Sequence, residues 1–144
     1  LWPATLSLDL DRLGRVLFCH ATPQSDTPIF TRLTADERLT PLFHAIAADV
    51  VVCGHTHMPF DRMVGSVRVV NAGSVGMPFG AAGADWLLIG PDLHLQHTAY
   101  DLSSAAGRIR ATAYPLAEEF AARSVLQPPA EQEMLDRFRA AELR

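Results

Sequence analysis

The sequence predicts an α/β fold, and the order of three segments carries this prediction. Two short runs of bulky apolar residues, RVLFC (residues 15–19) and DVVVC (residues 49–53), are typical of buried strands. A helix is predicted between them over about residues 41–48, because Thr40 and Pro41 suit the start of a helix. A strand, a helix and a strand in this order predict a βαβ unit with a parallel pair of strands.

The stretches around this unit predict loops and two hairpins. Residues 21–30 are rich in proline, threonine and serine, which favours a loop. Residues 61–71 form two strand-like runs around a Gly-Ser pair, which is a hairpin pattern. Residues 72–84 are rich in glycine and lack periodicity, so we expect a second loop there. Residues 85–100 again predict a strand, a turn and a strand, and the last of these alternates as a half-exposed strand does.

From Ser103 onward the pattern predicts helices. Pro115 separates two helical segments, and a third helix follows a pair of prolines. Glu133 and Arg137 are spaced for an ion pair across one turn of that helix. Its apolar residues fall on one face, and they are Met134, Leu135, Phe138 and Ala141.

Length and composition fit one globular domain. Of the 144 residues, 49% are hydrophobic and 19% are charged, which supplies enough apolar side chains for a core. We divide the chain into an α/β portion, residues 1–101, and a helical C-terminal extension, residues 102–144, packed on the same domain. The alternative for the last helix is that its apolar face binds a partner.

Charge and hydropathy exclude two classes of partner. The net charge is −4 and no basic cluster is present, so we expect no nucleic acid. No apolar run reaches the length of a membrane span, and no signal-peptide pattern is found, so we expect a cytoplasmic protein without a membrane segment. We expect Cys19 and Cys53 to be reduced and buried on adjacent strands, with no disulfide between them.

Histidines follow both of the apolar runs that predict the βαβ unit. His20 comes directly after residues 15–19, and His55 and His57 come just after residues 49–53. In open α/β sheets, ligands bind beyond the carboxyl ends of parallel strands, and residues i and i+2 of an extended chain project to the same side. Neutral imidazole is a common ligand of transition metals. We therefore expect the three rings to converge on a metal site.

Two motifs give the sequence a family resemblance. GHTHMPF (residues 54–60) followed by NAGSVGMP (residues 71–78) resembles the C-terminal half of the calcineurin-like metallophosphoesterases, and especially their small prokaryotic phosphodiesterase branch. VLFCHATP (residues 16–23) matches the place where that branch has a strand followed by His-Gly. ADWLLI and LHLQHTAYD match its closing strands, so the resemblance covers roughly residues 14–101.

The resemblance implies a fold, a reaction and a set of site residues. The fold would be the C-terminal part of a four-layered α/β/β/α sandwich, here with extra C-terminal helices. The family hydrolyses phosphodiesters or phosphomonoesters with a water activated between two divalent ions, for which Mn, Fe, Zn or Ni are suitable. By resemblance, His20 and His55 would bind one ion and His57 the other. Supporting positions in the loop that lines the substrate site would be Asn71, Gly73 and Ser74.

Several family motifs are absent from the sequence. The first half of such an enzyme carries Asp-x-His-Gly, a Gly-Asp that bridges the metals and an Asn-His-Asp type motif, and none occurs here. Ala21 stands where glycine is usual, and Phe79 stands where a basic residue often lies. We therefore expect this chain alone to bind at most one ion and to be a poor catalyst. Pairing with the missing N-terminal half, or formation of a homo-oligomer, would cover an open sheet edge.

Two further interpretations remain open. The chain can instead be a non-catalytic α/β module that keeps a residual histidine site and binds a partner through its C-terminal helices. A structural zinc site is a weaker alternative, because no fourth ligand has suitable spacing. The phosphoesterase interpretation implies a small phosphorylated substrate, whose identity the motifs do not specify. His44, His94 and His97 are expected to have structural or surface roles.

Overall fold

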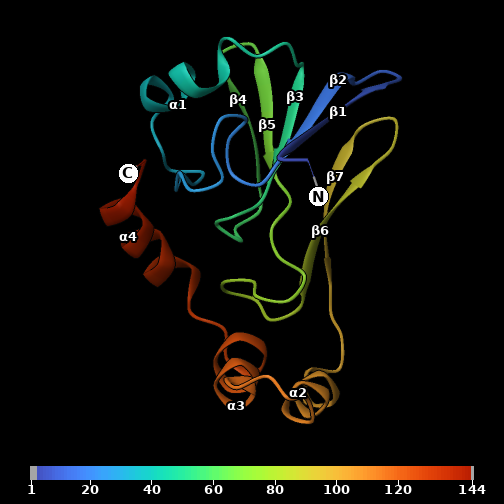
Figure 1. The fold of residues 1–144 in the computed structure, drawn as a ribbon, viewed down its shortest axis with the longest axis vertical. Helices are drawn as coiled ribbons and strands as arrows, with labels where there is room; N and C mark the ends of the chain where they lie inside the picture. The colour runs from blue at the N-terminus through green and yellow to red at the C-terminus, as the bar shows by residue number, and fades with distance from the viewer. Residues whose placement is uncertain (1–2, 144) are drawn as a thin grey trace.

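The computed structural model describes residues 3–143 (Figure 1). Its elements, in chain order, are β1 (Thr5–Leu10), β2 (Gly14–Cys19), α1 (Asp36–Phe43), β3 (Val50–Cys53), β4 (Phe60–Val64), β5 (Val67–Asn71), β6 (Ala84–Ile89), β7 (Leu93–Thr98), α2 (Leu102–Arg110), α3 (Ala117–Phe120), the π-helix η1 (Ala121–Leu126) and α4 (Glu131–Ala141). The predicted α/β fold class is confirmed, and both predicted hairpins are present.

The main sheet has five strands in the order β1-β2-β3-β5-β4. β3 pairs in parallel with β2 on one side and with β5 on the other. The two outer strands, β1 and β4, pair antiparallel with their neighbours β2 and β5. The predicted parallel pair of the βαβ unit is therefore confirmed, and it lies in the centre of the sheet.

Strand β1 was not predicted from the sequence. It pairs with β2 in a tight hairpin, from Thr5 opposite Cys19 to Leu10 opposite Gly14. Its leucines alternate with polar residues, which is the pattern of a strand with one apolar face. The sequence contains that pattern, but the first strand was predicted at residues 15–19 because the apolar run of β2 is the stronger signal.

The prediction for the first helix was wrong in its boundaries. The predicted helix over residues 41–48 lies instead at Asp36–Phe43, with Pro41 inside it and Thr40 within the helix rather than at its N-cap. The earlier start places Leu39 and Phe43, four residues apart, on one face, and both are fully buried. The acidic first turn also suits the positive end of the helix dipole. These gains outweigh the single backbone hydrogen bond that the proline removes.

Each face of the five-stranded sheet is covered by a different layer (Figure 1). On one face, α1 and Phe30 pack against the apolar residues of β3, β4 and β5. On the other face, the β6–β7 hairpin packs through Leu87, Ile89 and Leu93 against residues of β2, β3 and β5. The resulting order of helix, sheet and second sheet agrees with three of the four layers that the resemblance implies.

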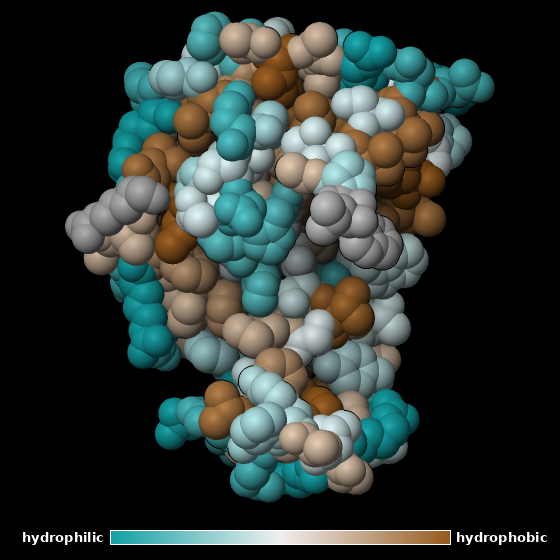
Figure 2. Space-filling model, viewed as in Figure 1, coloured by the Kyte–Doolittle hydropathy of each residue, from teal (hydrophilic) through white to brown (hydrophobic). Residues whose placement is uncertain are grey.

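The second sheet is too narrow to cover the whole face. It has two strands, and the sheet beneath it has five. Leu6 and Leu8 of β1 lie opposite Phe18 and Val16 in the register, on the face that the hairpin covers elsewhere. They nevertheless remain 50% and 44% exposed. Figure 2 shows hydrophobic atoms at the upper right, where the β1–β2 and β6–β7 hairpins of Figure 1 lie.

The C-terminal segment is helical, as predicted. The Asp101 side chain caps α2 by accepting from the Ser104 N–H at 2.9 Å. The predicted pair of Glu133 and Arg137 is formed at 3.1 Å on α4. Met134 and Leu135 of α4 pack against Met58, with Phe79 and Phe138 beside them. The division of the chain at residues 101 and 102 stays a prediction. None of the helices within residues 3–143 has the length and apolar character needed to cross a bilayer.

Both cysteines are free thiols, as predicted, on the adjacent strands β2 and β3. Cys53 is buried, but Cys19 is only half-buried, so the expectation that both are buried was wrong for Cys19. Burial raises the pKa of Cys19 to about 11. Burial also raises the pKa of Cys53, and the neighbouring Cys19 raises it further.

These shifts predict that both thiols are slow to alkylate in the folded protein. At pH 8, a thiol of pKa near 11 has about 240-fold less thiolate than an ordinary thiol of pKa about 8.5. In the native chain, reaction with an aromatic disulfide reagent should therefore be at least about 100-fold slower than in denaturant, and Cys53 should be the slower thiol. Stopped-flow absorbance on the Cys19→Ser and Cys53→Ser variants measures each rate. Equal native and denatured rates would contradict this burial.

Candidate functional site

Three parallel strands end at the same edge of the sheet. The Gly54 N–H donates to the His20 carbonyl at 2.9 Å, which carries the pairing of β2 and β3 one step past the strands. The Ala72 N–H donates to the Cys53 carbonyl at 2.9 Å, which does the same for β3 and β5. The segments that follow the three strands are thereby held side by side, where ligands of open α/β sheets bind.

His20 and His55 lie together at this edge. Nε2 of His20 is 3.0 Å from Nδ1 of His55, and either nitrogen can be the donor, depending on the tautomers. The ring centroids are 4.9 Å apart and the rings are inclined by 66°. The structure brings these two rings together, but the prediction was for three, and within residues 3–143 no three metal-binding side chains that would include His57 are grouped.

The surroundings of His55 favour its neutral form. Burial lowers the pKa of His55 below its ordinary value, and the neighbouring His20 and His57 lower it further. The Thr27 carbonyl and the Asp26 carboxylate act in the opposite direction, with smaller effect than burial. A neutral imidazole is the form that binds a metal ion.

The backbone that carries these histidines is strained. The Thr56 N–H donates to the Gly54 carbonyl at 2.7 Å, which closes a three-residue turn around His55. His55 and His57 have φ angles of 64° and 59°, in the left-handed region that residues with a side chain seldom adopt. Strain of this kind persists only where the surrounding structure holds it, and it is frequent at functional sites.

His57 is anchored apart from the pair. Its Nδ1 lies 3.0 Å from the Met77 carbonyl oxygen, and only the ring can donate in that bond, so Nε2 of the neutral ring keeps its lone pair. The ring stacks on Phe79 with centroids 5.7 Å apart. Phe79 in turn contacts Phe138 of α4 with centroids 5.9 Å apart. Phe79 therefore packs against His57, at a position where the family often has a basic residue.

The three supporting residues lie at the end of β5, for Asn71, and in the chain that follows it, for Gly73 and Ser74. Asn71 is fully buried and bonds to the histidine turn, whereas Gly73 and Ser74 are partly exposed. The Ser74 carbonyl accepts from the Asp85 N–H at 3.0 Å, and the Ser74 hydroxyl accepts from the Met77 N–H at 3.0 Å. Ser74 thus shapes the loop whose Met77 carbonyl orients His57.

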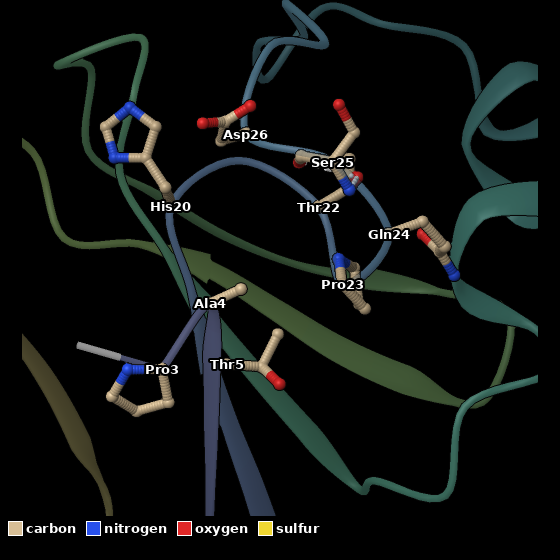
Figure 3. Close-up of a pocket in the computed structure, with 9 residues that line it drawn as sticks. All are labelled: Pro3, Ala4, Thr5, His20, Thr22, Pro23, Gln24, Ser25 and Asp26. Atoms are coloured by element: carbon tan, nitrogen blue, oxygen red, sulfur yellow. Dashed lines mark hydrogen bonds between the residues drawn. The ribbon is translucent and has the colours of Figure 1, made fainter. Parts of the chain in front are cut away.

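Asp26 was not singled out in the sequence. It lines a pocket of about 420 Å³ beside His20, together with Thr22, Ser25 and the start of β1. Figure 3 shows the Asp26 carboxylate turned toward the His20 ring. The Asp26 position in a loop directly after a strand-terminal histidine was the signal that could have indicated it.

The histidine pair passes a simple test as a site for one ion. A divalent ion about 2.1 Å from two imidazole nitrogens at a right angle separates those nitrogens by about 3.0 Å. This is the separation found between His20 and His55. Within residues 3–143, no three His, Cys, Asp or Glu side chains are close enough together to hold an ion. The pair thus offers two ligands, fewer than the three or four protein ligands usual for zinc, and the described residues do not fit a pair of ions.

Comparisons with known proteins agree with this fold. The family model of the calcineurin-like phosphoesterase superfamily domain matches residues 2–90. The chain is similar to a hypothetical protein from Pyrococcus horikoshii OT3, with a TM-score of 0.70 and 20% identity, over 89% of this chain and 52% of that one. It is also similar to a metallophosphoesterase from Sphaerobacter thermophilus, with a TM-score of 0.63 and 18% identity, over 84% of this chain and 56% of that one. No curated protein gives a match.

These structures are much longer than the chain. The chain spans 52% of the first structure and 56% of the second. At such low identity, the likeness shows the fold alone.

Gly73 provides a test of how tightly the loop is held. Its φ is 77°, and an added Cβ would lie 2.4 Å from Cβ of Asp85, whose carboxylate pairs with His97 at 2.7 Å. Gly73→Ala should therefore lower the free energy of unfolding by at least about 2 kcal/mol. The matched control is Gly76→Ala, because Gly76 has open space around it and ordinary φ. That change should stay within about 0.5 kcal/mol. Urea unfolding followed by circular dichroism measures both, and equal effects would contradict the close contact.

Proposed function

The chain belongs to the calcineurin-like phosphoesterase superfamily, and on this premise we propose that it supplies the histidine ligands of a metal-dependent enzyme that hydrolyses phosphate esters. The observation that carries the proposal is the pair of His20 and His55, with nitrogens 3.0 Å apart at the ends of parallel strands. The proposed reaction is hydrolysis of a phosphodiester or a small phosphomonoester. Mn, Fe, Zn and Ni are all suitable ions for imidazole-rich sites, and none is favoured by the residues.

Each histidine has a separate task in this proposal. A divalent ion, when bound, neutralises phosphate charge and lowers the pKa of water. His20 and His55 would hold that ion through the two nitrogens that lie 3.0 Å apart. His57 keeps the lone pair of its Nε2 because the Met77 carbonyl accepts from its Nδ1. It is thereby prepared to be a ligand of a second ion, as the resemblance implies.

The second ion depends on groups that this chain does not bring to the site. Two cations at close range repel each other unless an anion bridges them, and imidazoles carry no negative charge. We propose that carboxylates from the remainder of a complete phosphoesterase supply that bridge. The exposed Leu6 and Leu8 support this, because further strands beside β6 and β7 would cover them. Pairing between two copies of the chain is the competing way to cover the same face.

The pocket beside His20 is a suitable place for the organic part of a substrate. Its volume of about 420 Å³ is of the size that holds a small molecule. The Asp26 carboxylate gives the rim a negative charge beside His20, so a phosphate there would need a bound cation to offset the repulsion, and the uncharged part of the ester would lie near Thr22 and Ser25. Membrane and nucleic-acid partners are not part of the proposal, and the cytoplasmic location stays a prediction.

A non-catalytic module remains the second candidate. The observation in its favour is that no group of three metal-binding side chains is assembled within residues 3–143. In that case the histidines would bind an ion weakly, and the helices after Asp101 would bind a partner. The two candidates predict different results for a protein that also contains the remainder of the fold: the first predicts hydrolysis of phosphate esters, and the second predicts none.

The proposal predicts that the 144-residue chain binds one divalent ion and hydrolyses little. Isothermal titration with Mn²⁺ or Zn²⁺ should give a stoichiometry of at most one, because the chain lacks a bridging anion. His55→Ala should abolish this binding. His94→Ala is the matched control, because His94 is exposed on β7 and away from the histidine pair, and it should bind as the unchanged chain does.

The second prediction concerns a longer protein that includes the in-frame upstream sequence. With Mn²⁺, it should hydrolyse a generic phosphodiester such as bis(p-nitrophenyl) phosphate, and His55→Ala should lower kcat/KM by at least about 100-fold. Robust turnover by the 144-residue chain alone would contradict the need for added carboxylates. An inactive longer protein would favour the non-catalytic module, and an active one that His55→Ala leaves unchanged would contradict the role of His55 as a metal ligand.

A further inference from the structure

Asn71 is the only asparagine in the sequence, and its side chain is fully buried. It ends β5, in register with Cys53 of β3 and Phe60 of β4. Both of these neighbours belong to the apolar core beneath the site. An amide in such a place is costly unless all of its hydrogen-bonding groups find partners.

The Asn71 amide is fully bonded, and every bond lies in the loops of the site. Nδ2 donates to the Gly54 carbonyl at 2.5 Å and to the Thr56 hydroxyl at 3.1 Å. Oδ1 accepts from the Gly73 N–H at 2.9 Å. The two N–H groups and the oxygen of the amide are thereby used, two toward the histidine turn and one toward the loop after β5.

The two donated bonds fall on either side of His55. The Gly54 carbonyl that Asn71 holds is the same oxygen that closes the turn by accepting from the Thr56 N–H at 2.7 Å. Thr56, the other partner, separates the two histidines and is 2% exposed. A single side chain thus holds the residue before His55 and the residue after it.

His55 needs such support because its backbone is strained. With φ at 64°, the residue would gain by relaxing to an ordinary negative φ if the turn were released. That change would rotate the ring away from His20, whose Nε2 now lies 3.0 Å from Nδ1 of His55. The histidine separation therefore depends on what holds residues 54 and 56.

We infer that Asn71 is the positioning residue of the histidine pair: its buried amide locks the strained turn at His55 and so fixes the distance between the two proposed ligands. This inference rests on the proposed function only in treating the pair as ligands. Aspartate has the same shape but lacks the two N–H donors, and its carboxylate would face the Gly54 oxygen. Alanine and serine are too short to span both partners. The role thus requires an amide of this length.

The test uses Asn71→Asp, with Val69→Ala as the control. Val69 is fully buried on the same strand, so its truncation lowers the melting temperature without touching the turn. Binding of Co²⁺ to the 144-residue chain, followed by visible absorption, should weaken at least 10-fold in Asn71→Asp. It should change less than twofold in Val69→Ala. Equal losses in the two variants would overturn the inference, because they would mean that Asn71 acts only through stability.

A metal-free measurement separates this inference from the proposed function. Ring ¹⁵N signals of the histidines, recorded at pH 8 without metal, report the hydrogen bond between His20 and His55. They should shift to the values of free imidazole in Asn71→Asp and stay in place in Val69→Ala. If the unchanged chain binds no Co²⁺, the proposed function fails and the ring signals still decide: unshifted signals in Asn71→Asp overturn the positioning role.

Thr56→Val covers the case in which Asn71→Asp does not fold. It has nearly the same shape and removes only the hydroxyl that accepts from Asn71. It should weaken Co²⁺ binding about threefold and shift the His55 ring signals in the same direction as Asn71→Asp would. Unchanged binding together with unchanged ring signals in Thr56→Val would overturn the inference.

Discussion

The parallel pairing of β2, β3 and β5 is the constraint on which the other features of the site depend. Because the three strands run in one direction, His20, the histidine turn and Asn71 all follow strand ends at one edge of the sheet. The backbone bonds from Gly54 to His20 and from Ala72 to Cys53 continue this alignment beyond the strands. A slip of one residue between β2 and β3 would exchange the faces to which the residues of β3 point. It would also separate the two imidazoles.

Two kinds of packing then hold the histidines on this frame. His55 is held from beneath by a buried amide, and His57 is held from the side by the Met77 carbonyl and the Phe79 ring. The second brace reaches α4 through Phe138, and the Gly80 N–H adds a bond to the Pro129 carbonyl at 2.9 Å. The C-terminal helices thus contribute to the site by packing. This gives them a structural reason to be present that does not require a partner protein.

Electrostatics and packing both support the proposal that further residues complete the site. Within residues 3–143, the histidine pair has no carboxylate in a three-residue group with it, so a second cation would have no anion there to offset its repulsion. The narrow β6–β7 layer leaves Leu6 and Leu8 exposed, so one apolar face is incompletely covered. Strands that covered these leucines would also bring new residues to the edge of the second sheet. In our proposal, the same added strands would cover the two leucines and bring the carboxylates that a second ion needs.

The sequence by itself determined the elements whose information is local. The apolar runs of β2 and β3, the glycine turn of the β4–β5 hairpin and the helical period of α4 were all predictable, because side-chain periodicity and turn residues act within a few positions. Only the tertiary structure decided the start of α1, where the burial of Leu39 and Phe43 outweighed the local signal of Thr40 and Pro41. It also decided that His57 bonds to the Met77 carbonyl and that Asn71 holds the turn around His55. These hydrogen bonds join residues 15 to 35 positions apart in the sequence, so no local sequence pattern encodes them.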